Sequence, residues 1–315
     1  MSVQVLPGAV EVHPVGPERA GDVLTVVHAA FGARPVLDPP STATDETVES
    51  VAAALAAHPG LLAVSEGVPV GAMLLEPDGP LLRMRRVSVT PDAQSSGVAG
   101  ALVGSAERVA AEEGYDGLVL AARAELPATV EFWQHLGYAE TDREGTWLTM
   151  AKALPVEREA PDAEDTRRLG EQLAKVLRAG DLLILTGDLG AGKTTFTQGL
   201  GEGLGVRGGV TSPTFVISRV HPSLVDGPAL VHVDAYRLGG IEELDDLDLD
   251  TSLDDAVTVV EWGEGVAEGL AETRLEVTIT RPRGEDPDGG SDTRHLRFTP
   301  VGGRWIGAGL HEVLA

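Results

Sequence analysis

The chain has 315 residues, which is enough for two ordinary domains, and its 43% hydrophobic content is normal for a globular protein. Its formal net charge of −25 argues against strong direct binding to nucleic acid, because such binding depends on neutralising phosphates. The absence of cysteine excludes disulfides, thiolate metal sites and cysteine nucleophiles. No apolar run approaches the roughly 20 residues that span a bilayer, and the first residues show no secretory signal. We therefore expect a cytoplasmic protein without a membrane partner.

Along the chain, the first informative segment runs from Val87 to Tyr115 and predicts a strand, a polar glycine loop and a long helix. Val98, Leu102 and Ala106 recur at helical spacing and mark the apolar face of that helix. Backbone N–H groups in the loop can point at a pyrophosphate, because a helix N-terminus attracts anions. A loop of this kind is not specific on its own.

The segment from Ala128 to Lys152 then predicts a short helix, the triplet Leu-Gly-Tyr and a final strand. Together the two segments resemble the Gcn5-related acetyltransferase (GNAT) family over residues 15–153. Residues 94–99 stand at the family's Q/R-x-x-G-x-G/A loop, and FWQHLGY stands at its F-Y-x-x-x-G-F helix. The resemblance implies a mixed sheet with helices, acetyl-CoA as cofactor and an acetyl acceptor that the sequence does not identify. The cofactor-binding residues that it implies are Val87, Val89, Gln94, Ser95, Ser96, Gly97, Val98 and Ala99.

One position departs from the family pattern. Where many members have a tyrosine that can protonate the departing thiolate, this chain has Trp133, whose indole N–H donates a hydrogen bond but is no usable acid. Tyr115 and Tyr138 are nearby in sequence, but neither occupies the motif position. Either another group or water supplies the proton, or the domain binds acyl-CoA without turnover. Glu125 and Glu131 are candidates for the general base by residue type only.

A proline-containing, charged segment at 154–165 predicts a linker between a domain over 1–153 and a second domain over 166–315. The second domain is expected to open with a helix that Asp165 or Thr166 caps and that Gly180 ends.

The run GDLGAGKTT, from Gly187 to Thr195, fits the pattern G-x-x-x-x-G-K-[ST] and is the most informative in the chain. Its glycines let the backbone fold around a phosphate, Lys193 neutralises the β- and γ-phosphates, and the Thr194 hydroxyl can bind Mg²⁺. An apolar run, Asp181–Thr186, precedes the loop and a helical pattern follows it, which is the order that such a site requires. The sequence therefore predicts an α/β domain of the P-loop NTPase class.

Two later strands end in acids, VHVD at Asp234 and VTVVE at Glu261. Ligands of an open α/β sheet lie at the carboxyl ends of its strands, which would place both acids beside the loop. One would then hold Mg²⁺ and the other would polarise the attacking water. Taken singly, either acid is better explained as an ordinary turn or cap residue, but beside a phosphate loop the functional interpretation is favoured.

Four motifs in order, GDLGAGKTTF, VTSPTF, HVDAYRL and VVEWGEG, resemble the TsaE family, the ATPase subunit of the bacterial machinery that makes threonylcarbamoyladenosine in tRNA. The resemblance covers 156–315 and implies ATP and Mg²⁺ as cofactors. It also implies threonylcarbamoyl-transferring protein subunits as partners. The implied phosphate-binding residues are Asp188, Leu189, Gly190, Ala191, Gly192, Lys193, Thr194 and Thr195. The implied catalytic residues are Lys193, Asp234 and Glu261, and the implied metal ligands are Thr194, Glu261 and Asp234. Thr211, Ser212, Pro213 and Thr214 would form a switch-like segment that senses the γ-phosphate.

Other features remain open at this point. Arg237 either stabilises charge at the phosphates or pairs with a carboxylate. The acidic stretch 242–255 is either a solvated surface or a docking face for a basic partner. Trp262 either packs on the nucleotide or lies in a core.

Competing phosphate-loop classes fit less well: a GTPase would read guanine with N-K-x-D, and this chain has no asparagine. We therefore expect an ATPase of tRNA modification fused to an N-acetyltransferase domain. The alternative is an acyl-CoA- and nucleotide-sensing interaction protein.

Overall fold

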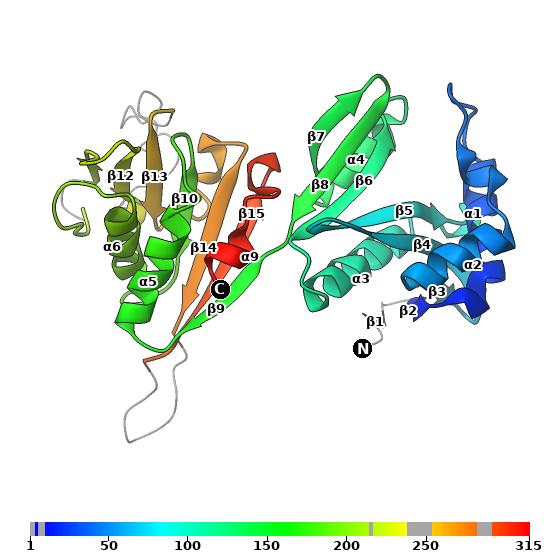
Figure 1. Ribbon diagram of the computed structural model, residues 1–315, viewed down its shortest axis with the longest axis horizontal. Coiled ribbons are helices and arrows are strands. Elements are labelled where there is room, and N and C mark those ends of the chain that lie inside the picture. The colour runs from blue at the N-terminus through cyan, green and yellow to red at the C-terminus, as the bar shows by residue number, and fades with distance from the viewer. Residues whose placement is uncertain (1–3, 6–9, 214–216, 238–253, 282–291) are drawn as a thin grey trace. The chain divides into compact units, whose positions relative to one another are not determined.

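The computed structural model describes residues 4–5, 10–213, 217–237, 254–281 and 292–315. The chain divides into two compact units, Met1–Leu154 and Pro155–Ala315, each built on its own mixed sheet (Figure 1). The predicted α/β class is confirmed for both. Over the residues described, none of the helices has the length and apolar character needed to cross a membrane.

The N-terminal unit contains an eight-stranded sheet in the order β1-β2-β3-β4-β5-β6-β8-β7. Its strands are β1 (Gln4–Val5), β2 (Val10–Val15), β3 (Gly60–Ser65), β4 (Val68–Asp78), β5 (Leu81–Val89), β6 (Gly117–Arg123), β7 (Ala139–Glu144) and β8 (Trp147–Ala153). Neighbouring strands are antiparallel except β5 and β6, which run parallel. A single parallel pair needs a crossover helix, and α3 (Val98–Glu112) provides it.

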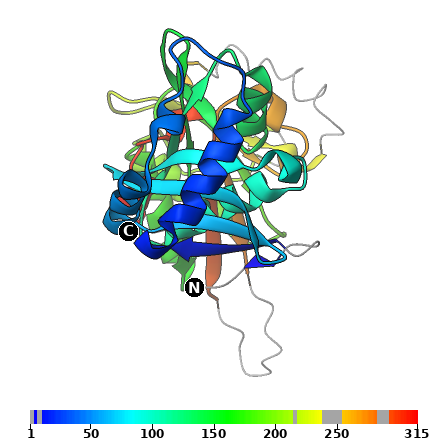
Figure 2. The ribbon, with the colours of Figure 1, turned by 90° about the vertical axis from the view of Figure 1, so that its right-hand side faces the viewer.

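Helices cover both faces of this sheet. On one face α1 (Ala20–Gly32) and α2 (Val48–Ala57) bury a core that includes Val23 and Val51, and Figure 2 shows α1 crossing the strands. On the other face α3 and α4 (Pro127–His135) bury a larger core that includes Leu102 and Trp133. Because both faces are covered, the central strands are apolar on both sides.

The parallel pair does not stay together along its length. β5 pairs with β6 only over Leu81–Met84, which lie opposite Gly117–Leu120. Beyond Met84, β5 continues to Val89 beside β4 alone, and its register with β4 shifts near Arg86, which has a φ of +51°. Such a bulge bends a strand away from its neighbour. The separation of β5 from β6 leaves backbone groups of β5 without a strand partner on that side.

The C-terminal unit contains a seven-stranded sheet in the order β11-β12-β13-β10-β14-β15-β9. Its strands are β9 (Val156–Ala160), β10 (Leu182–Thr186), β11 (Ser218–His221), β12 (Ala229–Asp234), β13 (Ala256–Glu261), β14 (Arg274–Thr280) and β15 (Arg294–Val301). Four adjacent strands, β12, β13, β10 and β14, are parallel, so their carboxyl ends lie at one edge. β14 and β15, at the other side of the sheet, form an antiparallel pair.

Helices α5 (Ala163–Ala174) and α6 (Lys193–Gly203) lie against each other on this unit (Figure 1), and a short helix, α9 (Leu310–Val313), ends the chain. Glycines permit the close approach of α5 and α6. A Cβ at Gly170 would clash with the backbone of α6, and a Cβ at Gly199 would clash with the carbonyl of Arg167. The helix that carries the phosphate-binding residues is therefore held firmly against α5.

The segment 154–165, predicted as a linker, has regular structure. Within it, β9 pairs with β15, and α5 begins at Ala163 with Asp162 as its N-cap, accepting from the N–H of Asp165. The expected cap at Asp165 or Thr166 is thus wrong, and so is the expected end at Gly180, because α5 ends at Ala174. The strand β9 could not be predicted from local sequence, because its partner strand, β15, lies far away along the chain.

Candidate functional site

The predicted phosphate loop lies at the carboxyl end of β10, in the middle of the C-terminal sheet, and α6 starts directly after it. Gly187 has a φ of +154° and Gly192 a φ of +115°, a region that side chains with a Cβ rarely adopt. A Cβ at Gly192 would also lie 3.3 Å from Nε of Arg294. Both glycines are thus required by geometry. The first N–H groups of α6 have no acceptor within the helix and form an anion site.

Lys193 is buried and folded back onto its own loop. Its Nζ donates to the carbonyls of Gly187 at 2.7 Å and Asp188 at 3.1 Å, and lies 3.7 Å from the centre of the Trp262 ring. Burial lowers the pKa of Lys193 below its ordinary value of 10.5, although Glu261, Asp234 and Asp188 act in the opposite direction. A phosphate entering the loop would give the Lys193 ammonium group a negatively charged partner in place of two neutral carbonyl oxygens.

The side chains of Thr194 and Glu261 are in contact next to the loop. The Thr194 hydroxyl donates to Oε1 of Glu261 at 3.0 Å, although 67 residues separate them in sequence. Nε2 of His232, which is fully buried, donates to the same oxygen at 2.9 Å. Because an ionised carboxylate only accepts, His232 holds its proton on Nε2. The histidine therefore fixes the carboxylate that the sequence predicts as a metal ligand.

The second predicted acid lies beside the first. Asp234 and Glu261 end neighbouring parallel strands and stand directly opposite each other in register. Ser212 donates to Oδ2 of Asp234 at 3.0 Å, and the N–H of Tyr236 donates to Oδ1 at 3.1 Å. One residue of the predicted switch segment thus contacts one of the predicted catalytic acids.

The donor set suits a hard cation. Thr194, Glu261 and Asp234 offer only oxygen atoms, which Mg²⁺ prefers. Within the described ranges no group of three His, Asp or Glu side chains could hold a metal by itself. The other ligands of a Mg²⁺ ion would come from nucleotide phosphates and water, as is usual for this ion.

Several predicted residues contribute less, or cannot be placed. The Leu189 side chain is 91% exposed, so only its backbone can serve the loop. Thr214, the side chain of Arg237 and residues 242–253 lie outside the described residues. Trp262 is not a core residue, as it lines a cavity of about 700 Å³ together with Gly187 and Asp188.

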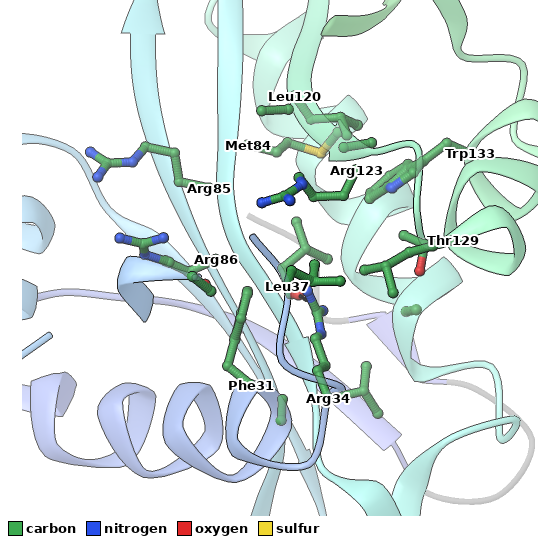
Figure 3. A pocket seen from close by; sticks show the side chains of 18 of the residues that line it. Phe31, Arg34, Leu37, Met84, Arg85, Arg86, Leu120, Arg123, Thr129 and Trp133 are labelled. Atoms are coloured by element: carbon green, nitrogen blue, oxygen red, sulfur yellow. Dashed lines mark hydrogen bonds between the residues drawn. The ribbon is translucent and has the colours of Figure 1, made fainter. Parts of the chain in front are cut away.

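In the N-terminal unit, the separation of β5 from β6 opens a second cavity of about 750 Å³ (Figure 3). Four residues predicted to bind acetyl-CoA line it, namely Val87, Val89, Gln94 and Ala99. Gly97, with a φ of +85°, forms the N-cap of α3. The Val98 side chain is buried in the core, and the Ser96 hydroxyl donates to the Ala93 carbonyl. Ser95, Ser96, Gly97 and Val98 can therefore contact a cofactor mainly through their N–H groups.

Among the described residues that line this cavity, none is a tyrosine that could replace the missing phenol. Trp133 lines it but is 4% exposed and packs edge-on against Tyr138. Burial, followed by the charge of Glu107, raises the pKa of Tyr138 well above its ordinary value of 10.0, and Tyr138 does not line the cavity. Tyr138 is therefore a core residue.

The expected bases Glu125 and Glu131 do not lie at this cavity either. Glu125 is held by Arg123 through contacts of 2.7 and 3.0 Å, and the Arg123 bond holds its pKa below the ordinary value. Among the residues described, Glu76 on β4 is the one carboxylate that lines the cavity, and it pairs with Arg85 at 2.9 Å. No local sequence pattern indicates Glu76, because its position at the cavity depends on strand register.

Comparison with known proteins matches each unit to a family model, and a curated relative shows the family of the C-terminal unit. Residues 160–287 match the model of the family "Threonylcarbamoyl adenosine biosynthesis protein TsaE", and residues 32–138 match the acetyltransferase (GNAT) family. The TsaE protein of Streptomyces coelicolor is 65% identical over 150 residues, which are 47% of this chain and 99% of that protein. The TsaE protein of Bacillus subtilis is 41% identical over 144 residues, covering 45% of this chain and 84% of that protein.

A solved structure also matches part of this chain. The PaiA N-acetyltransferase of Thermoplasma acidophilum, in complex with coenzyme A, is 15% identical with a TM-score of 0.42, over 46% of this chain and 99% of that one.

Proposed function

This chain belongs to the TsaE family through its C-terminal unit and joins to it a GNAT-family unit, and on that premise we propose that it hydrolyses ATP to cycle the protein complex that makes threonylcarbamoyladenosine in tRNA. A role in that modification follows from the family. The observation that carries the ATPase proposal is the buried contact of Thr194 with Glu261, with Asp234 directly opposite, beside a phosphate loop. A loop that only bound phosphate would not need two acids there.

The residues divide the work as follows. The loop from Asp188 to Thr195 cradles the phosphates through its N–H groups, and Lys193 turns from its loop carbonyls to the β- and γ-oxygens. Thr194 and Glu261 would hold Mg²⁺, which when bound supplies positive charge to the phosphates. Asp234 would orient the attacking water, and the hydrogen bond that it accepts from Ser212 links it to the switch segment.

Threonylcarbamoyl-transferring subunits are the proposed partners, and the cytoplasm is the proposed location. The net charge of −25 fits contact with proteins better than with tRNA itself. In this proposal the chain does no chemistry on the nucleoside, and its ATP turnover resets the subunits that do.

The test is ATP hydrolysis by the full chain, alone and with the purified threonylcarbamoyl-transferring subunits. We expect slow turnover alone and faster turnover in the complex. Fast turnover that the subunits leave unchanged, or none in either setting, would contradict the proposal.

For the N-terminal unit we propose acetyl-CoA-dependent N-acetyl transfer in the cavity between β5 and β6. Val87 and Val89 would offer backbone groups to the pantetheine arm, and the loop 94–99 would bind the pyrophosphate. Glu76 is placed to take the amine proton, directly or through water.

The buried Trp133, in place of a tyrosine acid, favours a second candidate function for this unit, the sensing of acyl-CoA without turnover. Calorimetric titration with acetyl-CoA, beside an assay of thiol release with added amines, separates the two. Binding with thiol release supports the transferase, and binding without release supports the sensor.

A further inference from the structure

The cavity of the N-terminal unit has an unusual charge for this acidic chain. Its lining contains five arginines and a single carboxylate, Glu76, whereas the whole chain carries a formal charge of −25. The arginines are Arg34, Arg83, Arg85, Arg86 and Arg123. An acceptor site for a purely cationic amine would be expected to show the opposite balance.

Four of these arginines are already neutralised. Arg83 pairs with Asp78, Arg85 with Glu76, Arg86 with Glu46 and Arg123 with Glu125. Arg34 is different: within the described part of the chain it makes no ion pair. Its guanidinium lies 3.9 Å from the centre of the Phe31 ring and donates to the Val87 carbonyl over 3.4 Å, which is a long hydrogen bond. Among the described residues, Arg34 is therefore the arginine of this cavity whose positive charge has no carboxylate partner.

The environment of Arg34 supports this description. The Arg34 side chain lines the cavity and is exposed to solvent, and the protein atoms near its guanidinium lower its pKa below the ordinary value by desolvation. Over the described ranges, no neighbouring carboxylate offsets that effect. An anion entering the cavity would offset it and raise the pKa of Arg34 again.

Arg34 is also held in place. It follows α1, and the segment after it is anchored at Asp38 and Pro39, whose carbonyls accept from Arg123 at 2.7 and 2.8 Å. Farther along, Arg86 donates to the Thr42 hydroxyl at 3.0 Å and pairs with Glu46 at 2.8 Å. Figure 3 shows Arg34 and Arg123 reaching into the cavity from different elements. Arg86 and Arg123, which are both ion-paired, thus position the segment that carries Arg34.

We infer that the acetyl acceptor is an amine that also carries an anionic oxygen group, a carboxylate or a phosphate, and that Arg34 binds this group. The inference rests on the proposed transferase function of this unit. A guanidinium matches both kinds of anion in a bidentate manner. Because Arg34 contacts the carbonyl of Val87, on the strand proposed to bind the pantetheine arm, the anionic group lies close to the thioester. The amine and the anion are therefore separated by few bonds.

The transfer step itself balances without a further reactant. The amine nitrogen, freed of one proton by Glu76 or water, attacks the thioester carbonyl and forms a C–N bond. The C–S bond breaks, and the thiolate of CoA leaves with a proton from water or from the amine. Arg34 takes no part in these bonds, so it is a specificity residue and not a catalytic one.

The test measures thiol release by the full chain with acetyl-CoA. Because the chain has no cysteine, the protein itself contributes no thiol to the signal. The amines are matched sets: each standard amino acid beside its amide, phosphoethanolamine beside ethanolamine, and spermidine and a lysine peptide as cationic members. Each is assayed with the natural protein, with Arg34→Gln and with Arg34→Lys. Arg143→Gln serves as the control, because Arg143 lies on β7, pairs with Glu140 and does not line the cavity.

We expect kcat/KM for the anionic member of a set to exceed that of its neutral partner by about tenfold or more. Arg34→Gln should abolish this preference by raising KM for the acceptor, with KM for acetyl-CoA unchanged. Arg34→Lys should keep part of it, and Arg143→Gln all of it. Whether the carboxylate or the phosphate set responds decides which anion is recognised.

Preference for a neutral or cationic amine would overturn the inference. So would a preference that survives Arg34→Gln, or an effect of that substitution on KM for acetyl-CoA instead. Absence of thiol release with every amine would refute the transferase function itself, and the inference with it.

Discussion

Both units place a glycine-containing loop between a strand and a helix, but they surround it with different side chains. In the C-terminal unit, Lys193, Thr194 and Glu261 lie around one loop, and the acids come from the ends of adjacent parallel strands. In the N-terminal unit, the loop before α3 faces a cavity in which the expected phenol is replaced by buried Trp133. A glycine loop therefore indicates where phosphate binds, and the neighbouring strands decide which chemistry follows.

The two sites also differ in charge. The C-terminal site brings two carboxylates, Glu261 and Asp234, to the ends of adjacent strands, whereas the N-terminal cavity is lined by five arginines, four of which already pair with carboxylates. The TsaE protein of Streptomyces coelicolor is almost fully covered by the match to this chain, so the tRNA-modification unit occurs without a GNAT unit. The two chemistries can therefore be tested separately in the full chain.

The largest effect is expected at the phosphate loop. Lys193→Ala should lower kcat for ATP by about 100-fold or more, because it removes a preorganised positive charge at the transferred phosphate. Acetyl-CoA binding by the other unit should not change. Lys175→Ala is the matched control, since Lys175 is exposed at the end of α5. Normal ATP turnover by Lys193→Ala, with the circular dichroism spectrum retained, would show that the site is wrongly assigned.

The next effect concerns the support of Glu261. His232→Ala should raise the Mg²⁺ concentration needed for half-maximal ATP binding by about 10- to 100-fold, because removing a residue that orients a metal ligand commonly costs that much. Binding of ATP in EDTA should change little. Calorimetric titration at several Mg²⁺ concentrations measures both quantities.

His295→Ala is the control for this experiment, because His295 is on β15, where its half-exposed side chain contacts Glu159 at 3.5 Å. An unchanged Mg²⁺ requirement in His232→Ala would mean that the histidine is a core residue without influence on the metal site.

The sequence predicts the contiguous parts of each site and misses the parts that depend on tertiary pairing. The loop at 187–195 is readable because its residues are neighbours, and Asp234 and Glu261 because parallel strands end at one edge. The position of Glu76 follows from the register of β4, which no local pattern reveals. His232 stands within a recognised motif, but its contact with Glu261 becomes visible only when two strands are placed side by side.

The substitution Tyr138→Phe, for which a smaller effect is expected, tests whether Tyr138 has a chemical role. Tyr138→Phe removes a 3.3 Å bond to Glu107 and should lower the free energy of unfolding by about 1.5 kcal/mol. Since the folded state holds the phenol proton more tightly, this stabilisation is complete below pH 10 and is lost as the pH rises further. The difference between the two proteins in urea unfolding should therefore narrow above that pH. If Tyr138 were the missing acid, the pH profile of acetyl transfer would also change, which we do not expect.

The smallest effect concerns the boundary between the units. Asp162 lies in the segment predicted as a linker, yet its carboxylate caps α5 by accepting from the N–H of Asp165 at 2.9 Å. Asp162→Ala should therefore destabilise the C-terminal unit by about 1 kcal/mol, as loss of an N-cap usually does. Asp162→Asn should restore most of that loss, because its amide oxygen can accept the same bond. Urea unfolding followed by the ATP-binding signal reports on this unit. If Asp162→Ala changed nothing, residues 154–165 would behave as the linker that their composition suggests. A loss that Asp162→Asn rescues would make them the first structural elements of the nucleotide-binding unit, since α5 packs directly on the helix that begins at Lys193.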